Sequence, residues 1–487
     1  MGGGCNDSVF FSPDKDNNMS NTDYDVCIVG AGAAGIFAAY AFIDSDYSVC
    51  LIDKQPNIGG TFANAWVNKW IPEPNIPPFK ELYDTLHIPP YQVYGDYAKS
   101  WMHAAFSKSG EESGLAFSFD GEALLAFLKQ KFELNKNIDV CLNTELISAA
   151  SSGGNISSVK VRTDYGIRHI TARFFVDATG NAVLCRYAGF PVVIGAEPQS
   201  TYGESLAPDS YKPDALNMPS LMYALTTNPD EAEDLTSVEV SDSVSFDGYI
   251  CIDDVTGKVF VNPLSGLGVS GRCAADNYDE AYRLSIERRK QHWKKVRDEL
   301  EKMSQQGVSD DTAWKGWKVG QRKYFLSKNY APMLGVRETY RVKCKKMLTQ
   351  NDLTKQITKD MTITQHFVAC GNHDVDIHGG GSQEIINFNQ KKLRPYGVPL
   401  ECFIPENSCN TFVAGRCAGS SHIAAASFRI NKSAAQGGWA VGNAIRLMCD
   451  TDKVNIQNID DAFVSDLLSE NYTGFLHTVE YLEENVL

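Results

Sequence analysis

The 13 cysteines of the 487-residue chain never form a Cys-x-x-Cys pair, because they stand singly along the sequence. This absence excludes zinc ribbons, ferredoxin-type iron–sulfur clusters and thioredoxin-like dithiols. Several cysteines, such as Cys27, Cys50 and Cys141, lie inside apolar runs, where a thiol acts as a small hydrophobe. Unpaired cysteines are typical of a reducing compartment, so we expect a cytoplasmic protein, and we assign no metal site.

The sequence also lacks an apolar run long enough to span a bilayer, and it has fewer basic than acidic residues. Lys and Arg number 45 against 60 Asp and Glu, which gives a formal net charge of -15. A protein of this charge repels nucleic acid and anionic lipid, so neither is an expected partner. The polar residues 1–22 contain no signal-peptide hydrophobic region, and we predict a disordered leader there, with Met19 as an alternative start.

A strand–turn–helix–strand pattern is present between residues 24 and 53. Its turn carries Gly30, Gly32 and Gly35 in the spacing Gly-x-Gly-x-x-Gly, and Asp53 ends the second strand. Such glycines allow a tight turn, close approach to a pyrophosphate and close helix–strand packing, while the carboxylate can accept ribose hydroxyls. The pattern predicts a dinucleotide site of the Rossmann type.

Three later features favour FAD over NAD as the dinucleotide. They are Gly59-Gly60-Thr61 shortly after the acid, Asp177-Ala178-Thr179-Gly180 at the end of an apolar strand, and "FVAGRCAGS" from Phe412. An extended dinucleotide with a ribityl arm needs contacts from distant parts of a sequence. Each motif alone could be an ordinary strand end, but their order indicates one long cofactor.

The composition divides the chain around these motifs. We predict an α/β fold class, in which a discontinuous Rossmann-like FAD-binding domain carries an inserted α+β substrate domain. The FAD-binding domain is expected over 23–190 and 405–449, and the inserted substrate or cap domain over 191–404, including a charged helix at 281–305. The acidic residues 450–487 are expected to form a helical tail.

The motifs together resemble those of the FAD-dependent oxidoreductases of the glutathione-reductase-like class, which have two dinucleotide-binding folds. The similar segments are "FDGEALLAFL" (119–128), "FVDATGNAVLCRYAG" (175–189), "LGVRETYRV" (334–342), "DVDIHG" (374–379), "YGVPLECFIP" (396–405) and "NTFVAGRCAGSSHIAAASFRI" (410–430). They follow in the family's order, and the resemblance covers residues from about 23 to 448.

The resemblance implies a set of FAD-binding residues. They are Gly30, Gly32, Ala34, Gly35, Asp53, Lys54, Gly59, Gly60, Thr61, Leu146, Thr179, Gly180, Gly415 and Arg416. It also implies a helix beginning near Asn431 whose positive end faces the isoalloxazine. There "INKSAAQGGWAVGNA" replaces the family's usual Pro-containing run, so the residues that touch the ring stay open.

His422 and Arg429 lie on either side of the late turn and are the candidate catalytic residues. We expect His422 to act in acid–base chemistry and Arg429 to anchor the substrate, because a guanidinium fork suits a carboxylate. The alternative for Arg429 is an ion pair with a structural carboxylate.

Two further groups are assigned to structure. Arg337 and Arg341 stand at helical i,i+4 spacing beside Glu338, which favours a structural ion-pair network. Asp374, Asp376 and His378 would share one face of a strand, a spacing that could suit a metal, but supporting or turn-capping roles are favoured.

The sequence thus predicts an FAD-dependent oxidoreductase of the dehydrogenase or oxidase type, acting on a small organic substrate between FAD and the inserted domain. No second well-formed Gly-x-Gly-x-x-Gly is present, which argues against a dedicated NAD(P)H domain. The alternatives are a flavin monooxygenase, and a flavin-dependent non-redox enzyme or flavin-binding partner protein. A homo-oligomer is left open.

Overall fold

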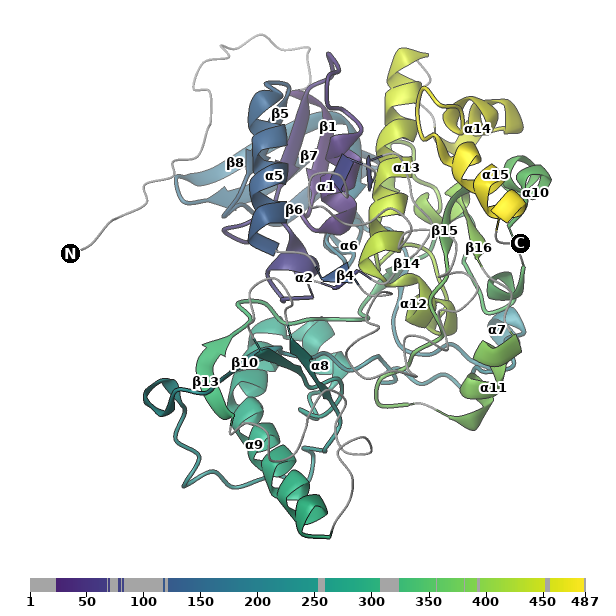
Figure 1. Ribbon diagram of the computed structural model, residues 1–487. Helices are drawn as coiled ribbons and strands as arrows, with labels where there is room; N and C mark the ends of the chain where they lie inside the picture. The colour runs from purple at the N-terminus through teal and green to yellow at the C-terminus, as the bar shows by residue number, and fades with distance from the viewer. Residues whose placement is uncertain are drawn as a thin grey trace.

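The computed structural model describes residues 23–67, 69–70, 78–79, 81–82, 117–118, 121–252, 259–306, 324–355, 357–380, 382–391, 395–451 and 456–485. The predicted leader, residues 1–22, lies outside them. The described residues form an α/β fold around a mixed, largely parallel sheet (Figure 1). The expected fold class is confirmed.

The central sheet has seven strands in the order β5-β2-β1-β8-β7-β6, with β17 also paired to β8. The strands are β1 (Tyr24–Val29), β2 (Val49–Ile52), β5 (Ile138–Cys141), β6 (Glu145–Ser152), β7 (Asn155–Thr163), β8 (Gly166–Asp177) and β17 (Thr411–Val413). Strands β5, β2, β1, β8 and β17 run parallel, and β2 and the C-terminal ends of β1 and β8 are buried.

Strand β8 joins two parts that the sequence pattern separates. The pattern suggests an alternating strand followed by a distinct apolar strand, whereas the structure has one continuous strand of 12 residues. Its first half pairs antiparallel with β7, and its second half pairs parallel with β1 on one side and β17 on the other. The late β17 therefore enters the sheet of the first residues, as the pattern from 410 onward predicts.

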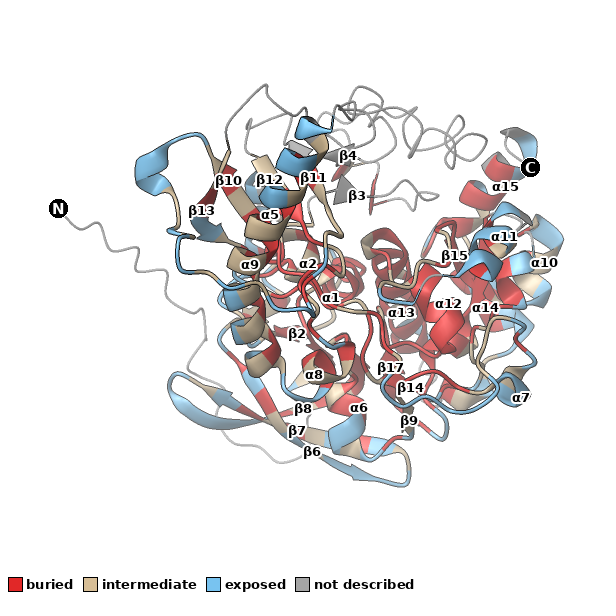
Figure 2. Cartoon of the chain, turned by 90° about the horizontal axis from the view of Figure 1, so that it is seen from below, coloured by how far each residue is buried: buried red, intermediate tan, exposed pale blue. Residues whose placement is uncertain are grey.

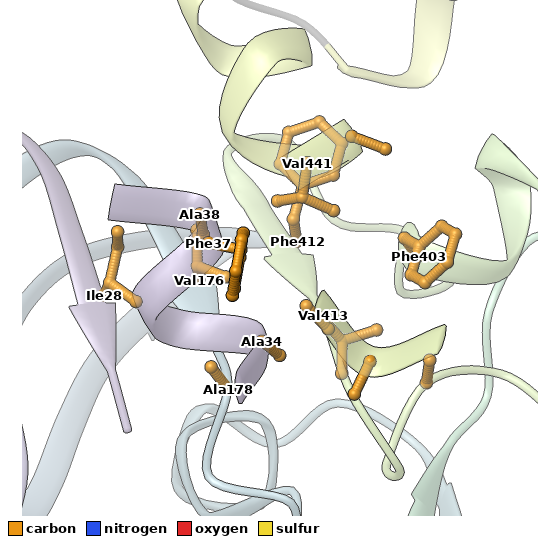
Figure 3. Close-up of a cluster of buried hydrophobic side chains, with 14 of the residues drawn as sticks. Ile28, Ala34, Phe37, Ala38, Val176, Ala178, Phe403, Phe412, Val413 and Val441 are labelled. Carbon is orange, nitrogen blue, oxygen red and sulfur yellow. The ribbon is translucent and has the colours of Figure 1, made fainter. Parts of the chain in front are cut away.

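Helix α1 (Ala33–Tyr40) follows β1, and α13 (Asn431–Asp450) packs along it (Figure 1). A Cβ at Gly438 would overlap the carbonyl oxygen of Ala34, and one at Gly442 would overlap that of Ala38. The unusual glycines of this segment thus permit two helices to approach closely. Figure 3 shows the apolar side chains of this contact, with Val441 of α13 facing the side of α1 that carries Ala38.

One large buried cluster contains side chains from residues 26–190 and from 342–482. Val342, Tyr396 and Phe403 belong to it, although the predicted boundaries place residues 342–404 in the inserted domain. The C-terminal helices α14 (Asp461–Leu467) and α15 (Phe475–Asn485) lie where the sequence predicts a helical tail, and both contribute to this cluster.

A separate antiparallel sheet lies in the lower part of Figure 1, in the order β11-β12-β10-β13. Its elements are β10 (Tyr223–Thr226), β11 (Tyr249–Ile252), β12 (Val259–Asn262), β13 (Phe325–Tyr330), α8 (Gly271–Asp276) and α9 (Tyr278–Gln305). Two further buried clusters, within residues 221–336, hold α9 on this sheet. The charged helix expected at 281–305 is confirmed, and we call this unit the insert.

Figure 2 shows that α12 and α13 are almost wholly buried, whereas the far ends of β6 and β7 are exposed. The remaining elements connect these units or cover the main cluster. They are α2 (Gly60–Ala63), β3 (Lys69–Trp70), β4 (Phe117–Ser118), α5 (Gly121–Leu134), α6 (Val183–Ala188), β9 (Val192–Val193), α7 (Gln199–Tyr202), β14 (Arg341–Val342), α10 (Lys359–Thr364), β15 (Phe367–Gly371), α11 (Gln383–Lys391), β16 (Tyr396–Pro399) and α12 (His422–Phe428).

Candidate active site

The carboxyl ends of the parallel strands bring four predicted motifs to one edge of the sheet. Gly30 follows β1, Asp53 follows β2, Thr179 follows β8 and Gly415 follows β17. From β1 the chain continues to β2 on one side, while β8 lies on the other side. A change of direction of this kind marks where ligands bind in open α/β sheets.

The first glycines fix the shape of the turn after β1. A Cβ at Gly35 would overlap the carbonyl oxygen of Gly30, so only glycine fits at that position. Gly30 has φ +108°, and a Cβ there would meet the backbone of Ala178. These two glycines are therefore required for close packing of the protein backbone, and neither leaves space for a ligand.

Gly32 is different, because a Cβ there would meet only the Cα of Gly60, at 3.9 Å. Gly60 lies against it with φ +48°, and Gly415, with φ +83°, would place a Cβ 3.1 Å from the Cβ of Ala34. Four residues from three distant segments thus lie side by side at the start of α1. The first backbone N–H groups of a helix have no partner within the helix. Such a cradle suits a diphosphate. We call Gly32, Ala34, Gly60 and Gly415 the cradle.

Asp53 supports the cradle with both carboxylate oxygens. Its Oδ2 accepts a hydrogen bond from the Ala31 N–H (2.6 Å), and its Oδ1 accepts one from the Gln55 N–H (2.8 Å). Burial raises the pKa of this carboxyl group although both hydrogen bonds oppose the rise. The Asp53 carbonyl accepts the N–H of Thr144 (2.8 Å), which places Leu146 nearby at the start of β6.

Thr179 shapes its own turn through its hydroxyl group. Its hydroxyl donates to Asp177 (2.7 Å) and accepts the N–H of Val183 (2.9 Å). The Gly180 carbonyl accepts the hydroxyl of Thr339 (2.8 Å). Gly59 donates its N–H to the carbonyl of Ala31 (2.8 Å), and Thr61 lies in the short helix α2 that follows.

Arg416 brings positive charge to the cradle. A Cβ at Gly180 would lie 2.9 Å from its guanidinium carbon, so the arginine covers that turn. Its Nε is buried and has no hydrogen-bond partner among the described residues, and burial lowers its pKa. Lys54, close by in sequence to Asp53, stands 4.8 Å above the ring of Tyr278 from the insert. An unmatched guanidinium beside a cradle of backbone N–H groups fits the diphosphate of FAD.

His422 begins α12 in a buried group of charged side chains. Its Nδ1 lies 2.9 and 3.0 Å from the two carboxylate oxygens of Glu338, and its backbone N–H donates to Glu197 (3.0 Å). Burial opposes ionisation of Glu338, but His422 and Arg341 outweigh it and lower the pKa of the carboxyl group. The histidine is therefore oriented by a carboxylate, as an acid–base group requires.

Arg341 completes this group, and its side chain is fully buried. It donates to Glu197 (2.7 Å) and the Ser420 carbonyl (3.0 Å), and it also pairs with Glu338. The expected ion-pair network is confirmed for Arg341. The helical spacing is wrong, because residues 334–340 are not helical and β14 begins at Arg341.

Two carboxylates of this group were missed by sequence reasoning. Glu197 and Glu204 lie in an ordinary polar segment, and Glu204 accepts hydrogen bonds from Ser421 (2.5 Å) and the Gln350 N–H (2.6 Å). Burial raises the pKa of Glu204. Their partners lie far away along the chain, so no local pattern could reveal them.

Arg429 makes an ion pair with Asp376 (Nη2 to Oδ2, 2.9 Å), which matches the alternative reading of this residue. His378 contacts the same oxygen through its Nε2 (2.8 Å). The strand expected for residues 374–378 is wrong, because these residues form an irregular loop. Burial opposes the ionisation of Asp376, yet His378 and Arg429 lower its pKa. No group of side chains suited to a metal occurs within the described ranges.

The fold and the cradle define a dinucleotide-binding α/β protein, and comparison with known proteins specifies the family. The sequence profile of the family described as "FAD dependent oxidoreductase" matches residues 25–469. The chain belongs to this family of FAD-dependent oxidoreductases, and the expected family and cofactor are confirmed.

Two curated relatives match parts of the chain. A digeranylgeranylglycerophospholipid reductase from Picrophilus torridus is 27% identical over 179 residues, which cover 36% of this chain and 44% of the relative. A 3-oxosteroid 1-dehydrogenase from Mycolicibacterium smegmatis is 33% identical over 86 residues, 18% of this chain and 14% of the relative. The matched region thus spans less than half the length of either relative.

Among solved structures, a geranylgeranyl bacteriochlorophyll reductase-like protein from Thermoplasma acidophilum is similar with a TM-score of 0.42. It is 13% identical, and the alignment covers 95% of this chain and 88% of that protein. In the described part of the chain, no helix has both the length and the apolar character that crossing a membrane requires.

Proposed function

We propose that the protein is a dehydrogenase or oxidase that acts on a small organic substrate bound between the FAD-binding unit and the insert. The observation that carries this proposal is the segment 331–341, which contacts both units. Met333 donates its N–H to the Asn64 carbonyl (3.1 Å), close to the cradle, and Leu334 donates its N–H to the Tyr278 hydroxyl (2.9 Å) of the insert. Thr339 then contacts the Gly180 turn.

In this proposal the cradle and Arg416 hold the diphosphate, and Asp53 and Leu146 lie toward the adenosine end. Lys54, Gly59, Thr61, Thr179 and Gly180 position the backbone around the same cofactor. Bound FAD supplies the chemistry of hydride transfer. The protein orients the substrate and moves the proton.

His422 is the proposed proton carrier at the substrate. Its contact with Glu338 holds the ring in one orientation and leaves Nε2 without a hydrogen bond among the described residues. Arg429 is the proposed substrate anchor, with Asp376 fixing its guanidinium. The start of α13, at Asn431, is proposed to point the positive end of the helix dipole toward the flavin.

The predicted boundaries, an FAD-binding domain over 23–190 and 405–449, an inserted domain over 191–404 and a tail over 450–487, are proposed with one change: residues 342–404 are assigned to the FAD-binding unit, because they share its buried cluster. We also propose a cytoplasmic location, supported by the free thiols of the described cysteines. The proposed partner is a small-molecule substrate, with no nucleic acid or membrane and with a homo-oligomer left open.

The visible spectrum of the purified protein tests the proposal. We expect bound FAD, and anaerobic addition of the right substrate should bleach the flavin band near about 450 nm. A His422→Asn variant should keep its FAD and lose most of its kcat, whereas His366→Asn is a matched control, because His366 also pairs with a glutamate, Glu401.

Three other results would contradict the dehydrogenase or oxidase assignment. Rapid NADPH consumption with oxygen would indicate a monooxygenase. Bound flavin that no substrate bleaches would indicate a non-redox enzyme or a flavin-binding partner protein. Colourless protein that takes up no FAD would defeat every flavin-based reading.

A further inference from the structure

A second arginine lies near Arg429 and has no ion pair with a carboxylate among the described residues. Arg337 belongs to the segment 331–341 that contacts both units, and its Nη1 donates to the Met218 carbonyl (2.7 Å). Its Nε and Nη2 make no hydrogen bond or ion pair with the residues that the structure describes. One edge of this guanidinium is therefore available to a ligand.

Arg429 also has a side-chain hydrogen-bond donor without a partner among the described residues. Its Nη2 is used by Asp376 (2.9 Å), but its Nε is buried and has no partner among the described residues. The side chain of Arg429 is only 11% exposed, so water does not readily replace a missing partner. A buried donor without an acceptor is costly, which favours a site that a ligand completes.

The two arginines belong to one group of contacts. Met218, whose carbonyl binds Arg337, donates its own N–H to the His378 carbonyl (3.2 Å). His378 shares the Asp376 carboxylate with Arg429. Burial, followed by the charge of Arg429, lowers the pKa of Arg337 to about 10, which indicates that the two guanidinium groups repel each other.

The two nearby aspartates, Asp376 and Asp247, make no ion pair with Arg337 among the described contacts. Asp376 is occupied by Arg429 and His378, and Asp247 of the insert, which also faces Arg337, accepts the Ser265 N–H (3.1 Å). His378 adds no positive charge at neutral pH, because burial and nearby Arg337 lower its pKa to about 4.

This group of contacts also adjoins the proposed proton carrier. Asn217 accepts the N–H of His378 through Oδ1 (2.8 Å) and donates through Nδ2 to Glu338 (3.1 Å), the partner of His422. Arg337 also directly precedes Glu338 in the chain, so a ligand group on Arg337 would be held close to the His422–Glu338 pair. Fixed spacing of this kind positions a substrate relative to an acid–base group.

We propose that Arg337, together with Arg429, binds a carboxylate group of the substrate. The proposal rests on the proposed function and specifies its substrate class as a small organic acid. A guanidinium presents two parallel N–H donors that match the two oxygens of a carboxylate, and in a partly buried site this fork discriminates strongly against neutral groups. Arg337 is thus reassigned from structure to substrate recognition.

The test is a binding comparison between carboxylates and their amides on the FAD-loaded protein at constant ionic strength. Acetate, benzoate and succinate are paired with acetamide, benzamide and succinamide, and binding is followed by the flavin spectrum and by thermal shift. We expect the best carboxylate to bind at least about tenfold more tightly than its amide. Arg337→Met should abolish this preference, and Arg337→Lys, which keeps charge without the fork, should retain part of it.

Arg288→Met is the matched control, because the bonds of Arg288 to described residues likewise go to backbone carbonyls, those of Leu267 (3.2 Å) and Gly268 (2.6 Å). It should leave the preference unchanged. Equal binding of every carboxylate and its amide to the wild-type protein would overturn the inference, as would a preference that survives in Arg337→Met. Failure to bind FAD would instead refute the proposed function, while thermal shift would still report on the carboxylate.

Discussion

The cradle and the buried charged group at His422 are built in opposite ways. The cradle consists of backbone, where Gly32, Gly60 and Gly415 leave room because they have no side chains. The charged group consists of side chains, where Glu338 and Arg341 satisfy each other inside the protein. The comparison teaches that the proposed cofactor site depends on residues that lack side chains, whereas the proposed proton-transfer site depends on charged side chains that pair with each other.

The largest expected effect comes from Gly35→Ala. A Cβ there would overlap the Gly30 carbonyl, which is backbone and cannot move aside. Overpacking of this kind should prevent stable folding or lower the melting temperature severely. Thermal unfolding of the apoprotein measures this effect, and a variant with wild-type stability would show that the turn is not rigid.

Arg341→Met should be the next largest, because it leaves Glu338 and Glu197 buried without their cation. Breaking a buried ion pair costs about 3–5 kcal/mol of unfolding free energy. The matched control is Arg162→Met, since the Arg162–Glu145 pair is exposed and should contribute less than about 1 kcal/mol. Equal losses in urea unfolding would remove the distinction between buried and exposed charge.

The pH dependence of stability tests the burial of His378, which lies beside Asp376. The pKa of His378 falls from 6.5 to about 4 on folding, so below pH 6.5 the unfolded chain binds a proton that the folded protein does not. Stability should therefore fall as pH decreases from 6.5 to about 4, by at most about 1.4 kcal/mol per pH unit. His378→Asn should flatten this slope, whereas His169→Asn, at an exposed position, should keep it.

Gly32→Ala should have the smallest effect on the fold and a selective effect on the cofactor. The new Cβ meets nothing closer than the Gly60 Cα at 3.9 Å, so the melting temperature of the apoprotein should stay near that of the wild type. The methyl group would stand where the diphosphate approaches, and the Kd for FAD should rise by about tenfold or more. Fluorescence titration measures this Kd, and unchanged FAD affinity would contradict the proposed position of the diphosphate.

Sequence reasoning predicted the cradle better than the charged group. The glycines after β1 and β17 are required by local backbone geometry, and such requirements leave spaced patterns in a sequence. Glu197, Glu204 and the open fork of Arg337 leave no pattern, because any polar segment can carry these residue types. The irregular loop at Asp376 was mistaken for a strand because charged residues alternate with apolar ones there. In this loop the ion pairs of the side chains, and not the hydrogen bonds of a sheet, hold the backbone in place.

The sequence by itself determined the class of fold, the order of the cofactor motifs and FAD as the cofactor, because backbone turns and apolar runs are encoded by neighbouring residues. Only the tertiary structure decided which carboxylate orients His422, that Asp376 pairs with Arg429, and that Arg337 keeps donors free. The physical reason is that electrostatic partners are chosen by distance in space, and residues far apart in the chain become neighbours only when it folds.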